Sequence, residues 1–260
     1  MLTPLTPGRR AALAIGVPLI LGGAVWNGLT LASLSGRATV TTTTSYDVQG
    51  THFTLASGDG NITVRQSPDA QVHLTSRVRY GIRAPHLAVR ADDTGLRIES
   101  HCSGYPDACS VDIDVSVPAT VSLDVEASGG DVHAAGLSGE TRLVSSGGDV
   151  TAMDMTGPLT LRSSGGDVRG DRLSSAQVTA ASSGGDVDVR FAQSPQLVDA
   201  HSSGGGVTVH VPIGQSYRIG ASSSGGEVHV SVPNNDLSER VLTAHSSGGD
   251  VTVAPDGVAR

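Results

Sequence analysis

The chain has 260 residues and a formal net charge of −8, with 17 basic residues, all of them arginine, against 25 acidic ones. This charge makes nucleic acid and anionic lipid unsuitable partners. The 3% aromatic content and the 34 glycines exclude a thick core built from large side chains. A thin core of Val, Ala and Leu between stacked short strands fits this composition, so the expected fold class is all-β.

The N-terminal 36 residues carry the membrane signal. Residues 1–10 end in Arg9 and Arg10, and the uncharged stretch from Ala11 to Gly36 exceeds the roughly 20 residues needed to span a bilayer. The positive-inside rule then predicts a cytoplasmic tail over 1–10, a transmembrane signal anchor over 11–36 and an extracytoplasmic C-terminal domain, so the expected localisation is the cell membrane, single-pass. A cleaved signal peptide is the alternative, although its apolar region is usually about 7–15 residues long.

Two segments connect the anchor to the regular part of the chain. Residues 37–44 are rich in Thr and are expected to form a linker. Residues 45–120 contain alternating runs such as HFTLAS and QVHLTSRVRY, which are typical of strands but have no regular period. This part is expected to be an irregular β layer that caps the repeats. Cys102 and Cys109 lie within it, and in an exported segment such a pair is expected to form a disulfide, with two free thiols as the alternative.

A repeated SSGGDV motif dominates residues 121–255, and residues 256–260 form a tail. The diglycine recurs with spacings of 18, 18, 19, 20, 21 and 23 residues, and an acidic residue follows it in six of the seven copies. The first glycines and the acidic residues define a predicted structural turn ladder: Gly129, Asp131, Gly147, Asp149, Gly165, Asp167, Gly184, Asp186, Gly204, Gly225, Glu227, Gly248 and Asp250.

Alternating columns of small residues flank each turn. Val stands three residues after the first glycine in all seven copies, and Val, Leu or Ala stands four residues before it. Such period-two alternation predicts one half-buried strand on each side of the turn. The diglycine is also compatible with a type I′ hairpin, but columns of matching residues favour parallel stacking of like on like. The sequence therefore predicts a β-solenoid, whose seven rungs would span about 34 Å.

The acidic residue of each turn has two interpretations. It can close its own turn by accepting hydrogen bonds from nearby backbone N–H groups, as in an Asx turn. Alternatively, the carboxylates can form a ladder that binds Ca²⁺. The calcium-binding repeat has a period of about nine residues, roughly half of the period here, and Gly206 would interrupt the ladder. The turn interpretation is therefore preferred, and no metal or other cofactor is predicted.

Ser, His and Asp occur together in DAHSSGGG and TAHSSGGD, which raises the question of a hydrolase. Catalysis needs one nucleophile held against one base, whereas this Ser recurs in the repeats and the sequence has no GxSxG elbow. His201 and His245 belong to copies two rungs apart and are expected not to stack. His133 and His229 fall at outward positions, and the nine His residues have no zinc-ligand spacing. The chain is therefore predicted not to be an enzyme and to have no catalytic residue.

The entry strand VDIDVSVPATVSLDVEASGGDV and the repeated LxxSSGGDVxxxxLxG units resemble the bacterial putative-adhesin family with β-strand repeats, also called toast-rack-like. The resemblance covers about residues 45–255. It implies a single-stranded, right-handed β-helix-like fold, an envelope location and a role in adhesion or in sensing envelope stress. It supplies no catalytic residues, and Gly206 and Glu227 depart from its SGGDV pattern.

These observations together predict a non-catalytic interaction module, anchored in the cytoplasmic membrane by its N-terminal helix and exposed outside it. Wall glycan or an envelope protein is the expected partner. The alternative function is an accessory or sensor protein of an envelope-stress response, which adjacent genes for a sigma factor or a two-component kinase would favour.

Overall fold

The computed structural model describes residues 38–47, 50–69, 71–80, 85–92, 95–102 and 109–256. These residues form 21 strands in two sheets and contain no helix, so the all-β prediction is confirmed for them. The predicted cytoplasmic tail and signal anchor, residues 1–36, lie outside the described residues. Within the described part, no helix has the length and the apolar character needed to cross a membrane.

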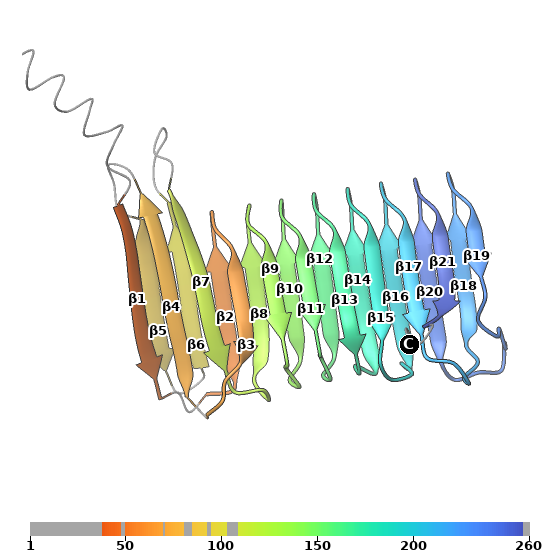
Figure 1. Cartoon of the computed structure of the whole chain (residues 1–260), viewed down its shortest axis with the longest axis horizontal. Helices are drawn as coiled ribbons and strands as arrows, with labels where there is room; N and C mark the ends of the chain where they lie inside the picture. The colour runs from red at the N-terminus through yellow and green to blue at the C-terminus, as the bar shows by residue number, and fades with distance from the viewer. Residues whose placement is uncertain are drawn as a thin grey trace, which may run out of the picture.

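The two sheets face each other along the length of a rod (Figure 1). In spatial order, the eleven-stranded sheet contains β1 (Ala38–Tyr46), β4 (Val72–Tyr80), β7 (Ser110–Val117), β3 (Ile62–Gln66), β9 (Val132–Ala135), β11 (Val150–Met153), β13 (Val168–Leu173), β15 (Val187–Phe191), β17 (Val207–Val211), β21 (Val251–Pro255) and β19 (Val228–Val230). The ten-stranded sheet contains β18 (Arg218–Ser223), β20 (Val241–Ser246), β16 (Leu197–Ser202), β14 (Gln177–Ser182), β12 (Leu159–Ser163), β10 (Thr141–Ser145), β8 (Ser122–Ala127), β2 (His52–Ser57), β6 (Gly95–His101) and β5 (His86–Asp92). At about 4.8 Å per strand, the rod is roughly 50 Å long, longer than the seven repeats alone predict.

Each SSGGDV turn joins a strand of the ten-stranded sheet to a strand of the eleven-stranded sheet, and we call the two strands with their turn a rung. Neighbouring rungs pair in parallel, with Ser145 beside Ser163 in one sheet and Val150 beside Val168 in the other. The two strands of a rung lie in different sheets and do not pair with each other as they would in a hairpin. This arrangement confirms the β-solenoid and excludes the type I′ hairpin.

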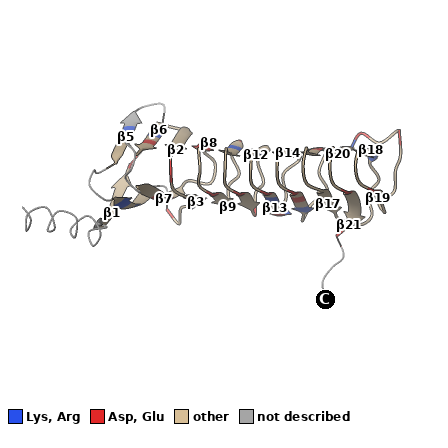
Figure 2. Cartoon of the chain, turned by 90° about the horizontal axis from the view of Figure 1, so that it is seen from above, with Lys and Arg blue, Asp and Glu red and all other residues tan. Residues whose placement is uncertain are grey.

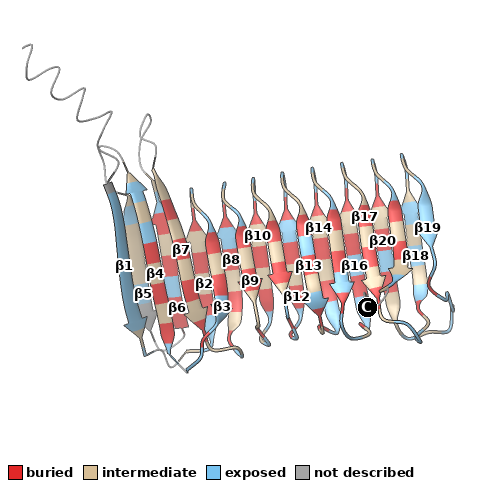
Figure 3. Ribbon diagram, in the orientation of Figure 1, coloured by how far each residue is buried: buried red, intermediate tan, exposed pale blue. Residues whose placement is uncertain are grey.

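The core lies between the two sheets and consists of the columns that the alternation predicts (Figure 3). Val150 and Val168 of the eleven-stranded sheet are fully buried, and so are Leu143 and Leu161 of the ten-stranded sheet. Each such side chain contributes about 1.5–3 kcal/mol of hydrophobic stabilisation. A core of this thickness is filled by Val, Leu and Ala, which explains why so few aromatic residues are needed.

The rungs do not stack in chain order at either end of the rod. The last rung of the chain, β20 with β21, lies between the β16/β17 rung and the β18/β19 rung. Likewise, β2 with β3 lies between β6/β7 and β8/β9. The count that placed His201 and His245 two rungs apart assumed stacking in chain order, and this assumption fails because matching columns do not specify which copy packs on which. The longer repeat spacings of 21 and 23 residues give the C-terminal connections the length to pass over one rung and return.

Residues 45–120, expected to form an irregular layer, contain two parallel rungs, β2/β3 and β6/β7, and antiparallel strands outside them. Strands β4 and β1 extend the eleven-stranded sheet in antiparallel fashion beyond β7, and β5 does the same beside β6. Residues 37–44, expected to be a linker, instead belong to a strand from Ala38 onward. Their β-branched Thr side chains suit a strand, and the segment pairs with β4.

A disulfide joins Cys102 and Cys109, whose Cα atoms are 5.9 Å apart. The bridge closes the connection between β6 and β7. Ser100 pairs with Ser57 and Ile113 pairs with Ile62, so this connection occupies the place of an SSGGDV turn in the stack. The bond therefore restricts an enlarged turn, which reduces the conformational freedom of this loop in the unfolded chain.

Candidate functional site

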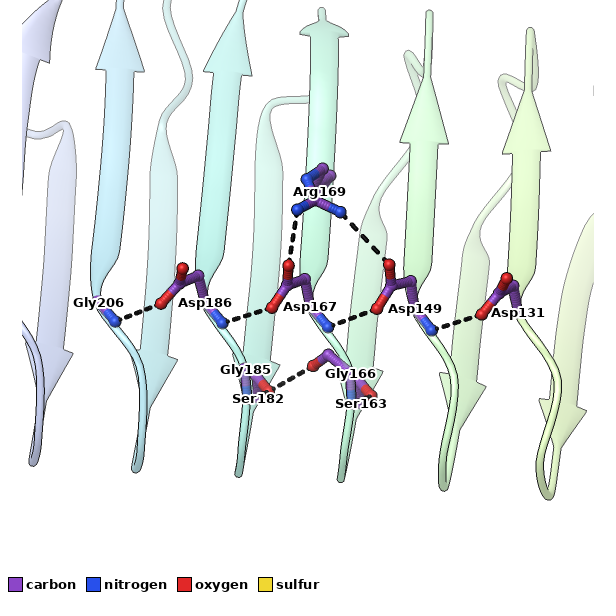
Figure 4. Close-up of polar contacts among 10 residues, drawn as sticks. All are labelled: Asp131, Asp149, Ser163, Gly166, Asp167, Arg169, Ser182, Gly185, Asp186 and Gly206. Carbon is purple, nitrogen blue, oxygen red and sulfur yellow. Dashed lines mark hydrogen bonds and ion pairs between the residues drawn. The ribbon is translucent and has the colours of Figure 1, made fainter.

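The SSGGDV turns line up along one edge of the rod, which we call the turn edge (Figure 1). Ser182, a buried residue of this edge, makes two hydrogen bonds. Its Oγ donates to the Gly166 carbonyl of the preceding rung at 2.8 Å and accepts from the Gly185 N–H of its own turn at 2.9 Å (Figure 4). The same two bonds are made by Ser145, Ser163, Ser202, Ser223 and Ser246. The repeated hydroxyl is therefore committed to the scaffold as both donor and acceptor.

The second glycine of each turn is required by the close approach of neighbouring rungs. A Cβ atom on Gly148 would lie 2.4 Å from the carbonyl oxygen of Gly130 in the preceding rung. The space at the first glycine varies between turns, since a Cβ atom would lie 3.4 Å from its nearest neighbour on Gly147 but 2.6 Å on Gly248. Among the described glycines, those with positive φ include none from the seven diglycines. Packing between rungs, and not a left-handed backbone, therefore explains the repeated diglycine.

The acidic residues form a ladder of hydrogen bonds along the turn edge (Figure 4). Oδ1 of Asp149 accepts the N–H of Asp167 at 2.8 Å, and Oδ1 of Asp167 accepts the N–H of Asp186 at 2.9 Å. The expectation that each Asp closes its own turn is therefore wrong. Stacked rungs are only about 4.8 Å apart, so a short carboxylate side chain reaches the equivalent N–H group of the next rung.

The ladder extends beyond the seven sequence repeats. Oδ1 of Asp112 accepts the N–H of Asn61 at 3.2 Å, and Oδ1 of Asn61 accepts the N–H of Asp131 at 2.9 Å. Neither residue follows a diglycine, so the repeat pattern did not identify them. The divergent SGDGNITV copy is the signal for Asn61, because Asn stands there in the place of the repeated Asp.

Gly206 breaks the ladder. Its N–H donates to Oδ1 of Asp186 at 2.8 Å, but it has no side chain to offer to Asp250 of the next rung. A hollow of about 460 Å³ opens at this position. Its lining includes Asp167, Asp186, Asp188, Asp250, Arg169, Thr208 and Thr252. We treat this hollow as the candidate binding site of the rod.

The charges around the hollow are partly paired. Arg169 contacts Asp149 at 3.4 Å and Asp167 at 2.6 Å, and because all three are substantially exposed each pair contributes at most about 1 kcal/mol (Figure 4). Oδ1 of Asp188 is buried and accepts no hydrogen bond, although Nε of Arg190 lies 3.7 Å from it. The described residues contain no group of three or more His, Cys, Asp and Glu arranged to hold a metal ion. The hollow presents carboxylates, hydroxyls and a guanidinium, which suit a polar ligand.

His201 and His245 stack on the outer face of the ten-stranded sheet, with ring centroids 5.2 Å apart and planes 8° apart. The expectation that they lie two rungs apart is wrong, because β20 is inserted directly beside β16. Ser222 of β18 adds a third polar group, with its Oγ 2.8 Å from Nδ1 of His245. Rung order, and not sequence distance, therefore brings these three side chains together.

Filling the gap in the ladder is expected to stabilise the protein. Gly206→Asn should raise the free energy of unfolding by about 1 kcal/mol, since Asn61 already shows that an amide oxygen serves in this ladder. The new Cβ would lie 3.2 Å from the Asp250 carbonyl oxygen, which requires a shift of a few tenths of an ångström. Urea unfolding measures the change. Gly220→Asn is the control, because a Cβ atom there meets nothing within 4 Å, and it should not raise the free energy of unfolding. A destabilised Gly206→Asn variant would contradict the prediction.

We expect His133 to make the stability of the rod depend on pH. It lies on the outer face of the eleven-stranded sheet between Thr63 and Thr151. Partial burial, with a smaller effect from the charge of Arg65, lowers the pKa of His133 below its ordinary value of 6.5. The unfolded chain therefore binds the proton more readily than the folded one. The stabilising contribution is present above about pH 6.5 and is lost as the pH falls through the lowered pKa.

The variant His133→Thr should weaken this pH dependence, because it supplies the residue of both neighbouring strands. We expect the urea midpoint to fall less between about pH 7.5 and pH 5.5 in the variant than in the parent chain. His229→Thr, at an exposed outward position, is the control and should keep the parental pH dependence. If the urea midpoint falls equally with pH in His133→Thr and in the parent chain, His133 does not have this role.

Several solved structures match the chain over most of its length. A putative adhesin from Bacteroides fragilis NCTC 9343 is 20% identical, with 83% of this chain and 97% of that chain covered and a TM-score of 0.47. A putative adhesin from Parabacteroides merdae ATCC 43184 is 13% identical, with 86% and 98% covered and a TM-score of 0.48. A putative cell adhesion protein from Clostridium sporogenes ATCC 15579 is 9% identical, with 84% and 100% covered and a TM-score of 0.34. No curated protein matches the chain.

The comparison with protein families is more specific than the comparison of structures. The Toastrack DUF4097 family model matches residues 107–254, which is more than half of the chain and includes all seven diglycine turns. The resemblance indicated by the entry strand and the SSGGDV repeats is thereby confirmed. The chain belongs to the Toastrack DUF4097 family.

Proposed function

We propose that the protein is a non-catalytic, adhesin-like interaction module, anchored in the cytoplasmic membrane by residues 11–36, whose β-solenoid binds wall glycan or an envelope protein outside the membrane. One observation carries the proposal. The repeated Ser hydroxyls, Asp carboxylates and Gly backbone groups are already used in contacts within and between rungs, whereas the outward strand positions differ from rung to rung. Recognition of a partner is therefore assigned to the outward side chains.

The outer face of the eleven-stranded sheet is the preferred surface. At equivalent outward positions, neighbouring strands carry Thr151, Arg169, Asp188 and Thr208. The last three line the hollow at Gly206. Segments coloured for basic and acidic residues recur along the rod (Figure 2). Hydroxyl, carboxylate and guanidinium groups on a flat strand surface provide the donors and acceptors needed for a ligand rich in hydroxyl and amide groups.

Binding of the full chain to isolated cell walls tests the proposal. The parent chain should sediment with the walls, and the hollow variant, which combines Arg169→Ala, Asp188→Ala and Thr208→Ala, should bind several-fold less. Those three side chains are outward, so their removal leaves the core intact.

The matched control carries the same three kinds of substitution on the other sheet, namely Arg162→Ala, Thr179→Ala and Asp199→Ala. These residues occupy outward positions of β12, β14 and β16. The control should keep the parental binding. If the parent chain sediments with the walls no better than the hollow variant, the proposal is contradicted. If the hollow variant and the control variant lose wall binding equally, the hollow is not the binding site. For the anchor, deletion of residues 11–36 should move the protein from the membrane fraction to the soluble one.

A further inference from the structure

At the C-terminal end of the rod, the described residues leave most of the cross-section through both sheets uncovered. β18 ends the ten-stranded sheet, β19 ends the eleven-stranded sheet, and each pairs with a neighbouring strand on one side. Val228 and Val230 of β19 are 44% and 39% exposed, whereas Val251 and Val253 at the same positions of the adjacent rung are fully buried (Figure 3). The apolar interior of the solenoid is therefore open to solvent at this end.

The opposite end of the rod is built differently. Beyond β3, the eleven-stranded sheet continues through three strands, and beyond β2 the ten-stranded sheet continues through two, so the sheets end at different levels. The outermost strand there, β1, carries the exposed polar run Thr41–Thr44. Staggered and polar edges are a common protection against further strand pairing. At the C-terminal end both sheets end on the same rung, β18 with β19, and the inward side chains of β19 are apolar and exposed.

Apolar side chains beside the terminal rung enlarge this surface. Ile213, in the connection before β18, is 72% exposed, and Leu237, in the connection after β19, is 91% exposed. A small, mainly apolar hollow of about 220 Å³ lies between Ile213 and the segment that follows β19, where Val232 and Pro233 line it. The connections on both sides of the terminal rung therefore also expose apolar side chains.

The edge of β18 is covered by its own chain only at its start. There Tyr217 forms a parallel β-bridge with Asn234, and Oδ1 of Asn234 accepts the N–H of Ile219 at 3.0 Å. On the inner edge of β18, which faces β20, the N–H of Arg218 donates to the carbonyl of Arg240 at 2.8 Å. Because backbone groups alternate sides along a strand, the N–H and C=O of Ala221 face the same side as those of Ile219, away from β20. This part of the edge is placed to pair with an added strand.

We propose that two copies of the chain join at this end, terminal rung to terminal rung, about a two-fold axis perpendicular to the sheets. Under this symmetry, β18 and β19 of one copy pair in antiparallel fashion with β18 and β19 of the other, and both sheets continue from copy to copy. The inference concerns assembly and does not depend on the ligand proposed above.

A second copy is the occupant that fits both sheets at once. A single added strand would extend one sheet and leave the interior exposed, whereas the occupant needed here presents two facing strands about 10 Å apart with apolar side chains between them. The terminal rung of another copy has these features. Charge also fits the two-fold axis, because Arg218 lies at one end of the terminal rung and Glu227 at the other. The axis brings the basic end of one copy beside the acidic end of its partner.

Sedimentation velocity of the full chain in detergent, over a range of concentrations, tests the assembly. The parent chain should form a dimer, and Val228→Lys should raise its dissociation constant at least about tenfold, because a charge would be buried in the paired end. Val40→Lys is the matched control. Val40 is 45% exposed on β1, the edge strand at the other end of the same sheet, so this change should leave the dimer intact.

A second variant separates loss of pairing from loss of folding. Ala221→Pro removes the N–H on the open side while sparing the bonds to β20, and it should give a monomer with the parental circular dichroism spectrum. Spin labels at Ser224, in the terminal turn, should report a shorter distance between copies than labels at Ser146, in the middle of the rod. A parent chain that is monomeric up to about 100 µM overturns the proposal. So does a dimer that persists in both Val228→Lys and Ala221→Pro, which would be the result if the membrane anchors held the two copies together.

Discussion

Gly148→Ala is expected to lower the free energy of unfolding by about 2–3 kcal/mol, whereas Gly147→Ala, in the same turn, should change it by less than about 1 kcal/mol. The Cβ added at Gly148 would lie 2.4 Å from the oxygen and 2.5 Å from the carbon of the Gly130 carbonyl. Both are backbone atoms, so no side-chain rotation relieves the clash. The two rungs must move apart, which lengthens the hydrogen bonds between them.

The comparison of these two glycines isolates the effect of rung packing. Both substitutions remove the same flexibility from the unfolded chain, so that contribution cancels. Urea unfolding followed by circular dichroism gives both midpoints. Because each rung contacts only its neighbours, a broadened transition would mean that the damaged rung separates the rod into two cooperative units. Equal midpoints for the two variants would show that close approach is not the reason for the second glycine.

Ser182→Ala is expected to cost about 2–3 kcal/mol of unfolding free energy. The hydroxyl bonds the Gly166 carbonyl at 2.8 Å and the Gly185 N–H at 2.9 Å, and its removal leaves both backbone groups without their side-chain partner. A donor and an acceptor lost together in a packed turn cost more than one exposed hydrogen bond. Urea unfolding measures the effect.

The neighbouring Ser183 provides the control. Its side chain is exposed, so Ser183→Ala should change the free energy of unfolding by less than about 0.5 kcal/mol. Ala127 occupies the equivalent position in the first SGGDV turn, which shows that one rung folds without this hydroxyl when its neighbours are intact. We therefore expect Ser182→Ala to fold at room temperature with a lower midpoint. A midpoint equal to that of Ser183→Ala would show that the buried hydroxyl adds nothing to stability.

Much of the scaffold was predictable because its signals are local. Period-two alternation identified the buried columns that contain Leu143 and Val150, and the matching columns pointed to parallel stacking, which the register of Ser145 with Ser163 confirms. The role of the Asp residues was not predictable in the same way. Their hydrogen-bond partners belong to the next rung, and a repeated motif contains no information about how far its neighbour lies from it.

The sequence by itself determined the all-β class, the rung with its turn and the inward columns, because each follows from the conformational preferences and spacing of a few consecutive residues. The tertiary structure decided the order of the rungs at both ends, the contact of His201 with His245, the hollow at Gly206 and the open terminal rung. The physical reason is that near-identical rungs offer one another nearly equal packing. Their order is therefore settled by the lengths of the connections and by what caps each end.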